Sequence, residues 1–240
     1  MDLDSLGLQQ GLIVSCQALE HEPLHSSFIM GKMAVAAQEG GAVGIRANTA
    51  QDIKEIKQKV PLPVVGIVKR NYGDHPVFIT PTITEVHELA ESGCEIIALD
   101  ATSRPRPDGV ALADLVKQIR LLYPELLLMA DVSTVEEGIM AEQLGFDLIS
   151  ATLVGYTEQT SHQKVYENDF AILKEMIRQI KTPIVAEGNI MTPEMAARCL
   201  ELGVYSVVVG GAITRPQQIT ARFMEKMKEV RSASIVQNRL

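Results

Sequence analysis

The chain has 240 residues, of which 46% are hydrophobic and 22% charged, and its formal net charge is −8. This length and apolar content suffice for one large domain with a buried core, while the acidic balance disfavours nucleic acid and anionic lipid as partners. No segment has the roughly 18 uninterrupted apolar residues of a membrane helix, and the N-terminus (MDLDSLGLQQ) is too acidic and polar for a signal peptide. The sequence therefore predicts a cytoplasmic protein that binds neither membranes nor nucleic acid.

Eight short apolar runs, rich in β-branched residues, recur along the chain. Because they lack the alternation of polar and apolar residues, they are typical of parallel strands buried on both faces. In chain order they span residues 11–18, 41–47, 63–70, 95–102, 125–133, 146–155, 182–189 and 205–213.

Between these runs lie segments whose apolar residues have helical spacing, such as 49–60, 82–93, 110–124, 133–145 and 192–203. Several begin at a Thr, Ser or Asp that can cap a helix, and three end at a glycine: Gly93, Gly145 and Gly203. Eight strand-helix units in about 250 residues describe a TIM (β/α)8 barrel. The rival, an open doubly wound sheet, lacks its GxGxxG fingerprint here. We predict a single-domain barrel over residues 1–240.

Two insertions interrupt the regular spacing. Residues 71–82 (NYGDHPVFITPT) follow the third strand and predict a short hairpin or lid beside the barrel mouth. Residues 156–169 follow the sixth strand, are polar, and are also expected near the mouth.

The active site of such a barrel lies at the C-terminal ends of its strands, so the polar residue that closes each apolar run is a candidate. In chain order these residues are Gln17, Arg46, Lys69, Asp100, Asp131, Thr152, Glu187 and the pair Gly210 and Gly211. Any one of them also fits an ordinary boundary between strand and loop. Together they bring several acidic and basic groups to one mouth.

The loops after the seventh and eighth strands, GNIMTP and GGAITRP, predict a phosphate site. Glycines allow backbone N–H groups to approach an anion, and a following helix N-terminus adds partial positive charge. Arg215 is placed to add a charge-assisted hydrogen bond. A phosphorylated small molecule is therefore the expected ligand.

Lys69 and Glu187 close the third and seventh strands, which lie opposite each other in an eight-stranded barrel. Burial makes a lysine easier to deprotonate and a carboxylate harder to ionise, so both groups are candidates for proton exchange near neutral pH. They would remove a proton from one face of a carbon and return it to the other. The alternative is a structural ion pair between the two side chains.

Nine short strings occur in order along the chain from about residue 11 to residue 230: GLIVSCQA, GAVGIRA, GIVKR, ITPT, IIALDAT, ADVST, ATLVGYT, VAEGNI and VVVGGAITRP. In the order and spacing of these strings, the sequence resembles the N-acetylmannosamine-6-phosphate 2-epimerases of sialic acid catabolism.

The resemblance implies a TIM barrel that interconverts N-acetylmannosamine 6-phosphate and N-acetylglucosamine 6-phosphate. It implies that Lys69 is the proton-transfer base and Glu187 its partner. Further site residues fall into two groups by this resemblance: Gln17, Arg46 and Asp131 hold the sugar and its N-acetyl group, and Gly188, Gly210, Gly211 and Arg215 hold the phosphate.

The chemistry agrees with this implication. C2 of the open-chain sugar is α to the C1 aldehyde, so its proton can be removed once the carbonyl is polarised. Reprotonation of the enolate on the other face gives the epimer, and neither a cofactor nor a metal is expected. Two points stay open: whether Arg46 or protonated Lys69 stabilises the oxyanion, and whether Lys69 works alone or with Glu187 and a substrate hydroxyl.

Two rival functions are retained. Lys69 as a Schiff-base lysine would give an aldolase-like lyase, and borohydride trapping with substrate distinguishes it. A sugar-phosphate sensor without catalysis would need the phosphate loops but no opposed acid and base. The sequence does not determine the oligomeric state. A homodimer is retained as a candidate, because helices on the outside of a barrel often pair with those of a second copy.

Other candidate groups are weaker. His21 and His25 are separated by Pro23, which disfavours a helical metal pair. Cys16, Cys94 and Cys199 are odd in number and lack CxxC spacing, so we expect packed, reduced thiols. Arg104 and Arg106 either reach the mouth or are solvated.

Overall fold

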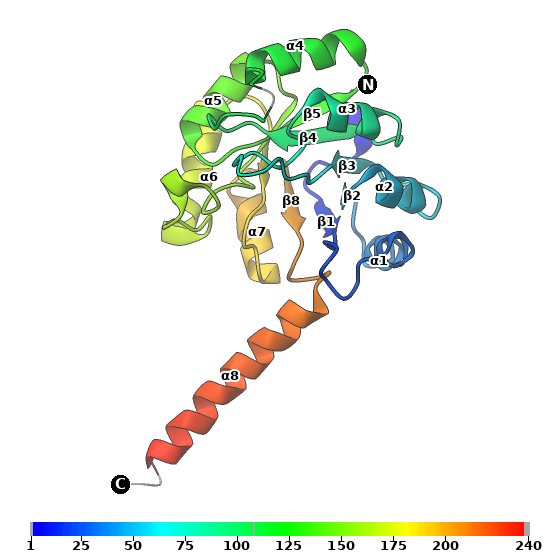
Figure 1. Cartoon of the computed structure of the whole chain (residues 1–240). Helices are drawn as coiled ribbons and strands as arrows, with labels where there is room; N and C mark the ends of the chain where they lie inside the picture. Colours follow the sequence, from blue (N-terminus) through cyan, green and yellow to red (C-terminus); the bar gives the residue numbers. More distant parts are fainter. Residues whose placement is uncertain (1, 108, 238–240) are drawn as a thin grey trace.

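A computed structural model describes residues 2–107 and 109–237, with side chains described as far as residue 230. Eight parallel strands close into a barrel in the order β1 to β8, and helices surround it (Figure 1). The strands are β1 (Leu12–Cys16), β2 (Gly44–Asn48), β3 (Val64–Ile67), β4 (Ile96–Asp100), β5 (Leu127–Asp131), β6 (Leu148–Ser150), β7 (Ile184–Ala186) and β8 (Ser206–Val209). Seven of them lie within the predicted apolar runs, and β2 extends one residue beyond its run at 41–47. Because the strands close into a barrel, the TIM barrel prediction is confirmed and the open sheet is excluded.

Helices alternate with the strands in the described part of the chain. They are α1 (Ser27–Glu39), α2 (Ala50–Lys57), α3 (Ile83–Ala90), α4 (Leu112–Leu122), α5 (Val135–Gln143), α6 (Glu167–Gln179), α7 (Pro193–Glu201) and α8 (Pro216–Gln237), with short 3-10 turns at Asp4–Leu6 and Glu158–Thr160. Threonines cap α3 and α5, in agreement with the N-cap residues expected from the sequence, and Thr82 and Thr134 each form a full capping box.

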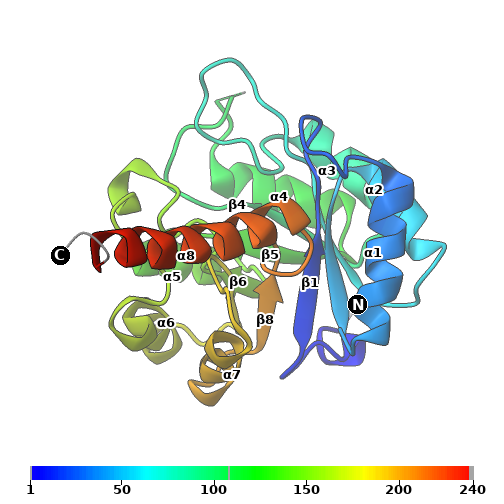
Figure 2. The same ribbon diagram turned by 90° about the horizontal axis from the view of Figure 1, so that it is seen from below.

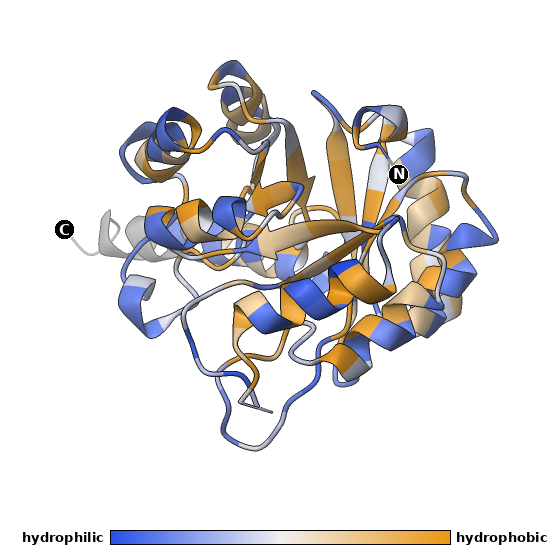
Figure 3. Ribbon diagram, turned by 90° about the horizontal axis from the view of Figure 1, so that it is seen from above, coloured by the Kyte–Doolittle hydropathy of each residue, from blue (hydrophilic) through white to orange (hydrophobic). Residues whose placement is uncertain are grey.

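Two apolar layers hold the barrel together. One fills the barrel interior and includes Ile13, Ile96 and Leu148; the other lies between the strands and the helices. Figure 3 shows the hydrophobic colouring concentrated on the strands, while the helices alternate hydrophobic and hydrophilic residues. Because both faces of each strand are buried, the strands read as continuous apolar runs in the sequence.

The insertion after β3 forms the expected hairpin. Its two arms pair through an antiparallel bridge between Lys69 and Ile79. Backbone hydrogen bonds on either side, Arg70 N to Phe78 O and Thr80 N to Val68 O, complete it. The hairpin therefore fixes the backbone of Lys69 beside the barrel mouth.

Helix α8 departs from the usual barrel arrangement. It projects away from the barrel instead of packing against β8 and β1 (Figures 1 and 2). Three apolar side chains of this helix are largely exposed: Phe223 (69%), Met227 (49%) and Val230 (62%). They are spaced at i, i+4 and i+7 along the chain. That spacing places them on one face of the helix, which leaves an uncovered apolar stripe.

No helix within the described residues is long and apolar enough to cross a membrane.

Candidate active site

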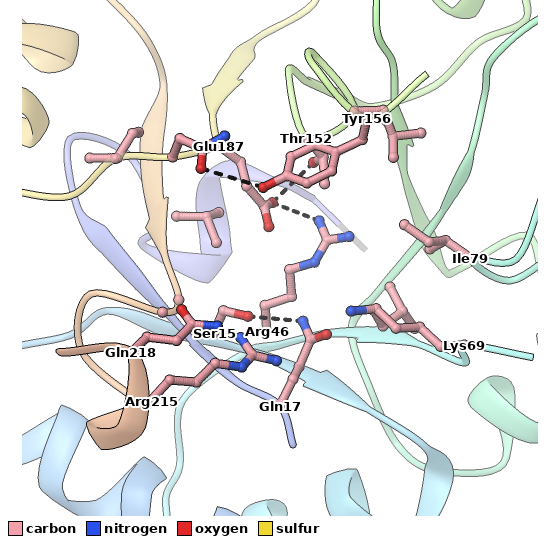
Figure 4. Close-up of a pocket in the computed structure, with 18 of the residues that line it drawn as sticks. Ser15, Gln17, Arg46, Lys69, Ile79, Thr152, Tyr156, Glu187, Arg215 and Gln218 are labelled. Atoms are coloured by element: carbon pink, nitrogen blue, oxygen red, sulfur yellow. Dashed lines mark hydrogen bonds and ion pairs between the residues drawn. The ribbon is translucent and has the colours of Figure 1, made fainter. Parts of the chain in front are cut away.

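A cavity of about 320 Å³ opens at the C-terminal ends of the strands (Figure 4). Its size falls within the usual range for small-molecule sites. Charged and polar lining residues are Ser15, Gln17, Arg46, Lys69, Thr152, Tyr156, Glu187, Asn189, Arg215 and Gln218. Glycines 188, 210 and 211 also line it.

Lys69 enters this cavity from the hairpin that follows β3. Its backbone N–H donates to the side chain of Asn48 at 2.9 Å, which fixes its position relative to β2. Burial, followed by the positive charges of Arg46 and Arg215, lowers the pKa of the Lys69 amine from its ordinary 10.5 to about 8. About a tenth of this amine is therefore neutral, and available as a base, at pH 7.

Glu187 lies just past β7 and reaches into the cavity from a different side (Figure 4). Its Oε2 accepts hydrogen bonds from Arg46 at 2.8 Å and from Thr152 at 3.1 Å. Oε1 has no hydrogen-bond partner among the described residues and is left for a ligand. Burial raises the pKa of Glu187, and the charge of Asp131 adds to this while Arg46 opposes it.

The alternative interpretation, a structural ion pair between Lys69 and Glu187, is wrong, because the two side chains do not pair in the structure. The cationic partner of Glu187 is Arg46. Since β3 and β7 are opposite strands of the closed barrel, Lys69 and Glu187 approach the cavity across its width.

Arg46 is held by two carboxylates at the base of the cavity. Its Nη2 lies 2.5 Å from Asp131 Oδ2, and its Nη1 donates to Asp131 Oδ1 at 3.0 Å as well as to Glu187. The side chains of Arg46 and Asp131 are only 1% and 0% exposed. Burial by itself lowers the pKa of the Arg46 guanidinium, but the charges of Asp131 and Glu187 outweigh burial and raise it. Arg46 is thus permanently cationic and keeps Glu187 in place.

The glycine-containing loops of the cavity suit a phosphate. The N–H groups of Gly188, Gly210 and Gly211 have no acceptor among the described residues. Gly188 has a φ of +110°, and a Cβ there would lie 3.1 Å from Val165 Cγ2, so the turn requires glycine. A Cβ on Gly211 would lie 2.2 Å from Gln218 Oε1. Arg215 borders the same loop, so backbone donors and one guanidinium converge there.

Eight of the nine residues predicted for the site line this one cavity, and Asp131 is the exception. Its carboxylate is fully buried behind Arg46, so it holds Arg46 instead of facing the ligand space. Direct contact between Asp131 and a sugar therefore remains only a prediction. Of the other strand-end candidates, Thr152 lines the cavity, whereas Asp100 binds Arg104 and Thr102 away from it.

Sequence reasoning missed several lining residues. Ser15 accepts a hydrogen bond from Gln17 Nε2 at 2.9 Å, and Tyr156 contacts Asn189 at 3.5 Å across the mouth. Ser15 lies within an apolar strand, where a single polar residue in an inward position was the available signal. Three further polar residues were not singled out. Tyr156 and Asn189 lie in loops that the sequence places near the mouth, and Gln218 lies in the first turns of α8.

The remaining candidates are accounted for by packing. Burial raises the pKa of the Cys16 thiol to about 12, which leaves it protonated and unreactive. The guanidinium of Arg106 donates to the backbone oxygens of Pro81 and Asp100, and Arg104 binds the Asp100 carboxylate. These arginines brace the loops after β3 and β4 and do not line the cavity.

Comparison with known proteins gives a consistent result. Residues 30–229 match a family model described as "Putative N-acetylmannosamine-6-phosphate epimerase". A relative from Oceanobacillus iheyensis, described as "Putative N-acetylmannosamine-6-phosphate 2-epimerase", is 61% identical over 90% of this chain and 98% of its own. A relative from Staphylococcus carnosus with the same description is 59% identical over 92% of this chain and 99% of its own.

Comparison with solved structures gives the same family. The N-acetylmannosamine-6-phosphate 2-epimerase from Clostridium perfringens superposes with a TM-score of 0.88 at 53% identity, covering 94% of this chain and 96% of that one. A thiamine phosphate pyrophosphorylase from Pyrococcus furiosus has a TM-score of 0.59 at 17% identity, covering 89% of this chain and 91% of that one. This second likeness reflects the barrel fold alone.

Proposed function

Because the chain belongs to the N-acetylmannosamine-6-phosphate epimerase family, we propose that it is an isomerase that interconverts N-acetylmannosamine 6-phosphate and N-acetylglucosamine 6-phosphate. The reaction inverts C2 of the sugar and serves amino-sugar catabolism downstream of sialic acid. The observation that carries the proposal is the convergence of Lys69, Glu187 and a glycine-lined anion site on one cavity.

In the proposed reaction, the neutral Lys69 amine removes the C2 proton of the open-chain sugar. The electron pair of the C–H bond moves into an enolate whose oxygen is the former C1 aldehyde oxygen. The lowered pKa of Lys69 supports this role, because a useful fraction of the amine is unprotonated near neutral pH. Proton transfer is redox-neutral, so it requires neither an oxidant nor a reductant.

Stabilisation of the enolate is best assigned to the Lys69 ammonium that the first step creates. Both terminal nitrogens of Arg46 already donate to Asp131 and Glu187, so much of its charge is offset by these carboxylates. We assign to Arg46 the orientation of Glu187. In its protonated form, which its raised pKa favours, Glu187 would then donate a proton from Oε1 to the opposite face of C2, directly or through a substrate hydroxyl. Glu187 takes up a new proton from solvent and the Lys69 ammonium releases the C2 proton to solvent, which restores both groups.

The direct test is interconversion by the purified protein, starting from either epimer and followed by proton NMR of the anomeric signals. The variant Lys69→Met should abolish product formation. The matched control Lys117→Met changes an exposed lysine on α4 and should leave it intact. An inactive parent protein would refute the proposal, and borohydride trapping of a protein-sugar adduct at Lys69 would favour the lyase instead.

We also propose that two copies of the chain associate through α8. A 22-residue helix that projects from its barrel with an apolar stripe on its surface is unfavourable unless another surface covers that stripe. A second copy offers the same helix and the same uncovered barrel flank by symmetry, so each α8 would lie on the other barrel.

Sedimentation should report twice the monomer mass. Phe223→Glu, on the apolar stripe, should shift the population toward single chains, whereas Lys228→Glu on the same helix should not. A monomeric parent protein would contradict this assembly.

We place the enzyme in the cytoplasm. Its free cysteines, Cys16, Cys94 and Cys199, are all buried and unpaired, which suits a reducing compartment.

A further inference from the structure

Glu22 lies in the loop between β1 and α1 and is paired with Arg215, 193 positions further along the chain. Arg215 Nε donates to Glu22 Oε1 at 2.6 Å and Nη2 donates to Glu22 Oε2 at 3.0 Å. The side chains of Glu22 and Arg215 are 10% and 17% exposed. The hydrogen bonds from Arg215, ahead of other causes, lower the pKa of Glu22.

The carboxylate of Glu22 is itself fixed by two further donors. The backbone N–H of Leu19 donates to Oε2 at 2.8 Å, and Gln217 Nε2 donates to Oε1 at 3.0 Å. One donor comes from the β1 loop and the other from the first turn of α8. Glu22 therefore ties together the two loops that border the anion site.

The pairing with Glu22 uses one edge of the Arg215 guanidinium and leaves Nη1 available on the other edge. Nε and Nη2 are used by Glu22, while Nη1 lies on the side of Gly210, where an added Cβ would be 4.0 Å from it. A bidentate partner on one edge of a guanidinium prevents rotation, so Nη1 is held toward the glycine loop.

We propose that Glu22 is a positioning residue for the phosphate group of the substrate: it holds Arg215 so that Nη1 and the N–H groups of Gly210 and Gly211 converge on one anion. This inference rests on the proposed function for the identity of the substrate. An arginine that is fixed before binding loses little side-chain freedom when the phosphate arrives, which improves affinity. Glu22 does not line the cavity that holds Lys69 and Glu187.

The geometry also separates this role from its opposite, in which Glu22 competes with phosphate for Arg215. A competitor would occupy the edge of the guanidinium that faces the glycine loop, and its removal would tighten binding. Here the carboxylate occupies the other edge, so its removal should weaken binding.

The test compares Glu22→Ala and Glu22→Gln with Glu91→Gln, an exposed glutamate beyond α3 as control. For Glu22→Ala, KM for the sugar phosphate should rise about tenfold or more while kcat stays within about threefold, the pattern of lost uniform binding. Glu22→Gln should show a smaller rise, because its amide oxygen still accepts one hydrogen bond from Arg215.

A double-mutant cycle shows whether Glu22 works through Arg215. In an Arg215→Met background, Glu22→Ala should produce little further change in KM. Independent, additive effects would overturn the proposal, as would an unchanged or lowered KM in the single variant. A loss confined to kcat would also overturn it.

Calorimetric titration with inorganic phosphate keeps this test separate from the proposed reaction. Weaker phosphate binding by folded Glu22→Ala, with Glu91→Gln unchanged, supports the positioning role even if the parent protein fails to epimerise. Equal phosphate affinity in parent and variant refutes it even if the enzyme is active. Circular dichroism and thermal melting confirm that each variant is folded.

Discussion

Replacing Lys69 by methionine should inactivate the enzyme and at the same time stabilise its fold. The amine is a proposed base, and its loss should lower kcat by about 10²–10⁴-fold or more. The same amine is held in a buried site beside the cations Arg46 and Arg215, which destabilises its charged form. Methionine has a similar length and no charge.

The size of the stabilisation follows from the pKa. The fall of the Lys69 pKa from 10.5 to about 8 means that the protonated amine destabilises the folded state by about 3 kcal/mol. This is an upper value, because the residue retains some contact with solvent. The sign is that of a group whose folded pKa is depressed below its unfolded value: the cost is fully present below pH 8. It disappears as the pH rises from about 8 to 10.5, because the unfolded lysine then loses its proton too.

Urea unfolding at pH 7 and at pH 9.5 measures this. Lys69→Met should be more stable than the parent by up to about 3 kcal/mol at pH 7, or roughly 5–10 °C in Tm, and by clearly less at pH 9.5. The control Lys117→Met removes an exposed charge and should change neither value appreciably. Equal stability of parent and Lys69→Met at both pH values would refute the idea that Lys69 is held in a strained electrostatic environment.

Four further predictions concern the surrounding site. The parent kcat/KM should rise about tenfold per pH unit below pH 8 and level off above it, since the neutral Lys69 amine is required; a flat profile would count against it as the base. Arg215→Met should shift the rising part of the kcat/KM profile to higher pH, because the Arg215 charge lowers the pKa of Lys69. An unshifted profile would contradict this. Asp131→Ala should cost about 3–5 kcal/mol in urea unfolding by leaving Arg46 without its buried bidentate partner, and a loss below 1 kcal/mol would show the pair to be dispensable. Gly188→Ala should raise KM and lower Tm because its φ of +110° strains any other residue; unchanged values would mean that the loop can rearrange.

Much of the barrel could be predicted from the sequence because burial on both faces leaves a local signal. The run at 95–102 contains β4 and the run at 125–133 contains β5, each closed by a carboxylate. The turn glycines are equally local: Gly145 and Gly203 have φ of +82° and +96°, as expected of residues that end helices.

Only those site residues that close an apolar run could be predicted from the sequence. Asp131 and Glu187 both close apolar runs, yet one is buried under Arg46 and the other faces the cavity. The difference depends on the order in which side chains stack across the barrel, which a linear pattern does not contain. Two such carboxylates therefore look alike in the sequence.

Long-range pairings and the path of α8 left no local signal. Glu22 and Arg215 meet because the barrel brings its first and last loops together, and neither residue has a distinctive neighbourhood in the sequence. The apolar stripe of α8 predicts that the helix is covered, but it does not specify which surface covers it.

The account depends on removal of the C2 proton by Lys69, and incorporation of solvent deuterium tests this most directly. With N-acetylmannosamine 6-phosphate in D₂O, NMR should show deuterium at C2 of the N-acetylglucosamine 6-phosphate formed by the parent protein, and neither product nor exchange with Lys69→Met. Epimer formed without deuterium at C2, or exchange that persists in Lys69→Met, would contradict proton abstraction by this lysine.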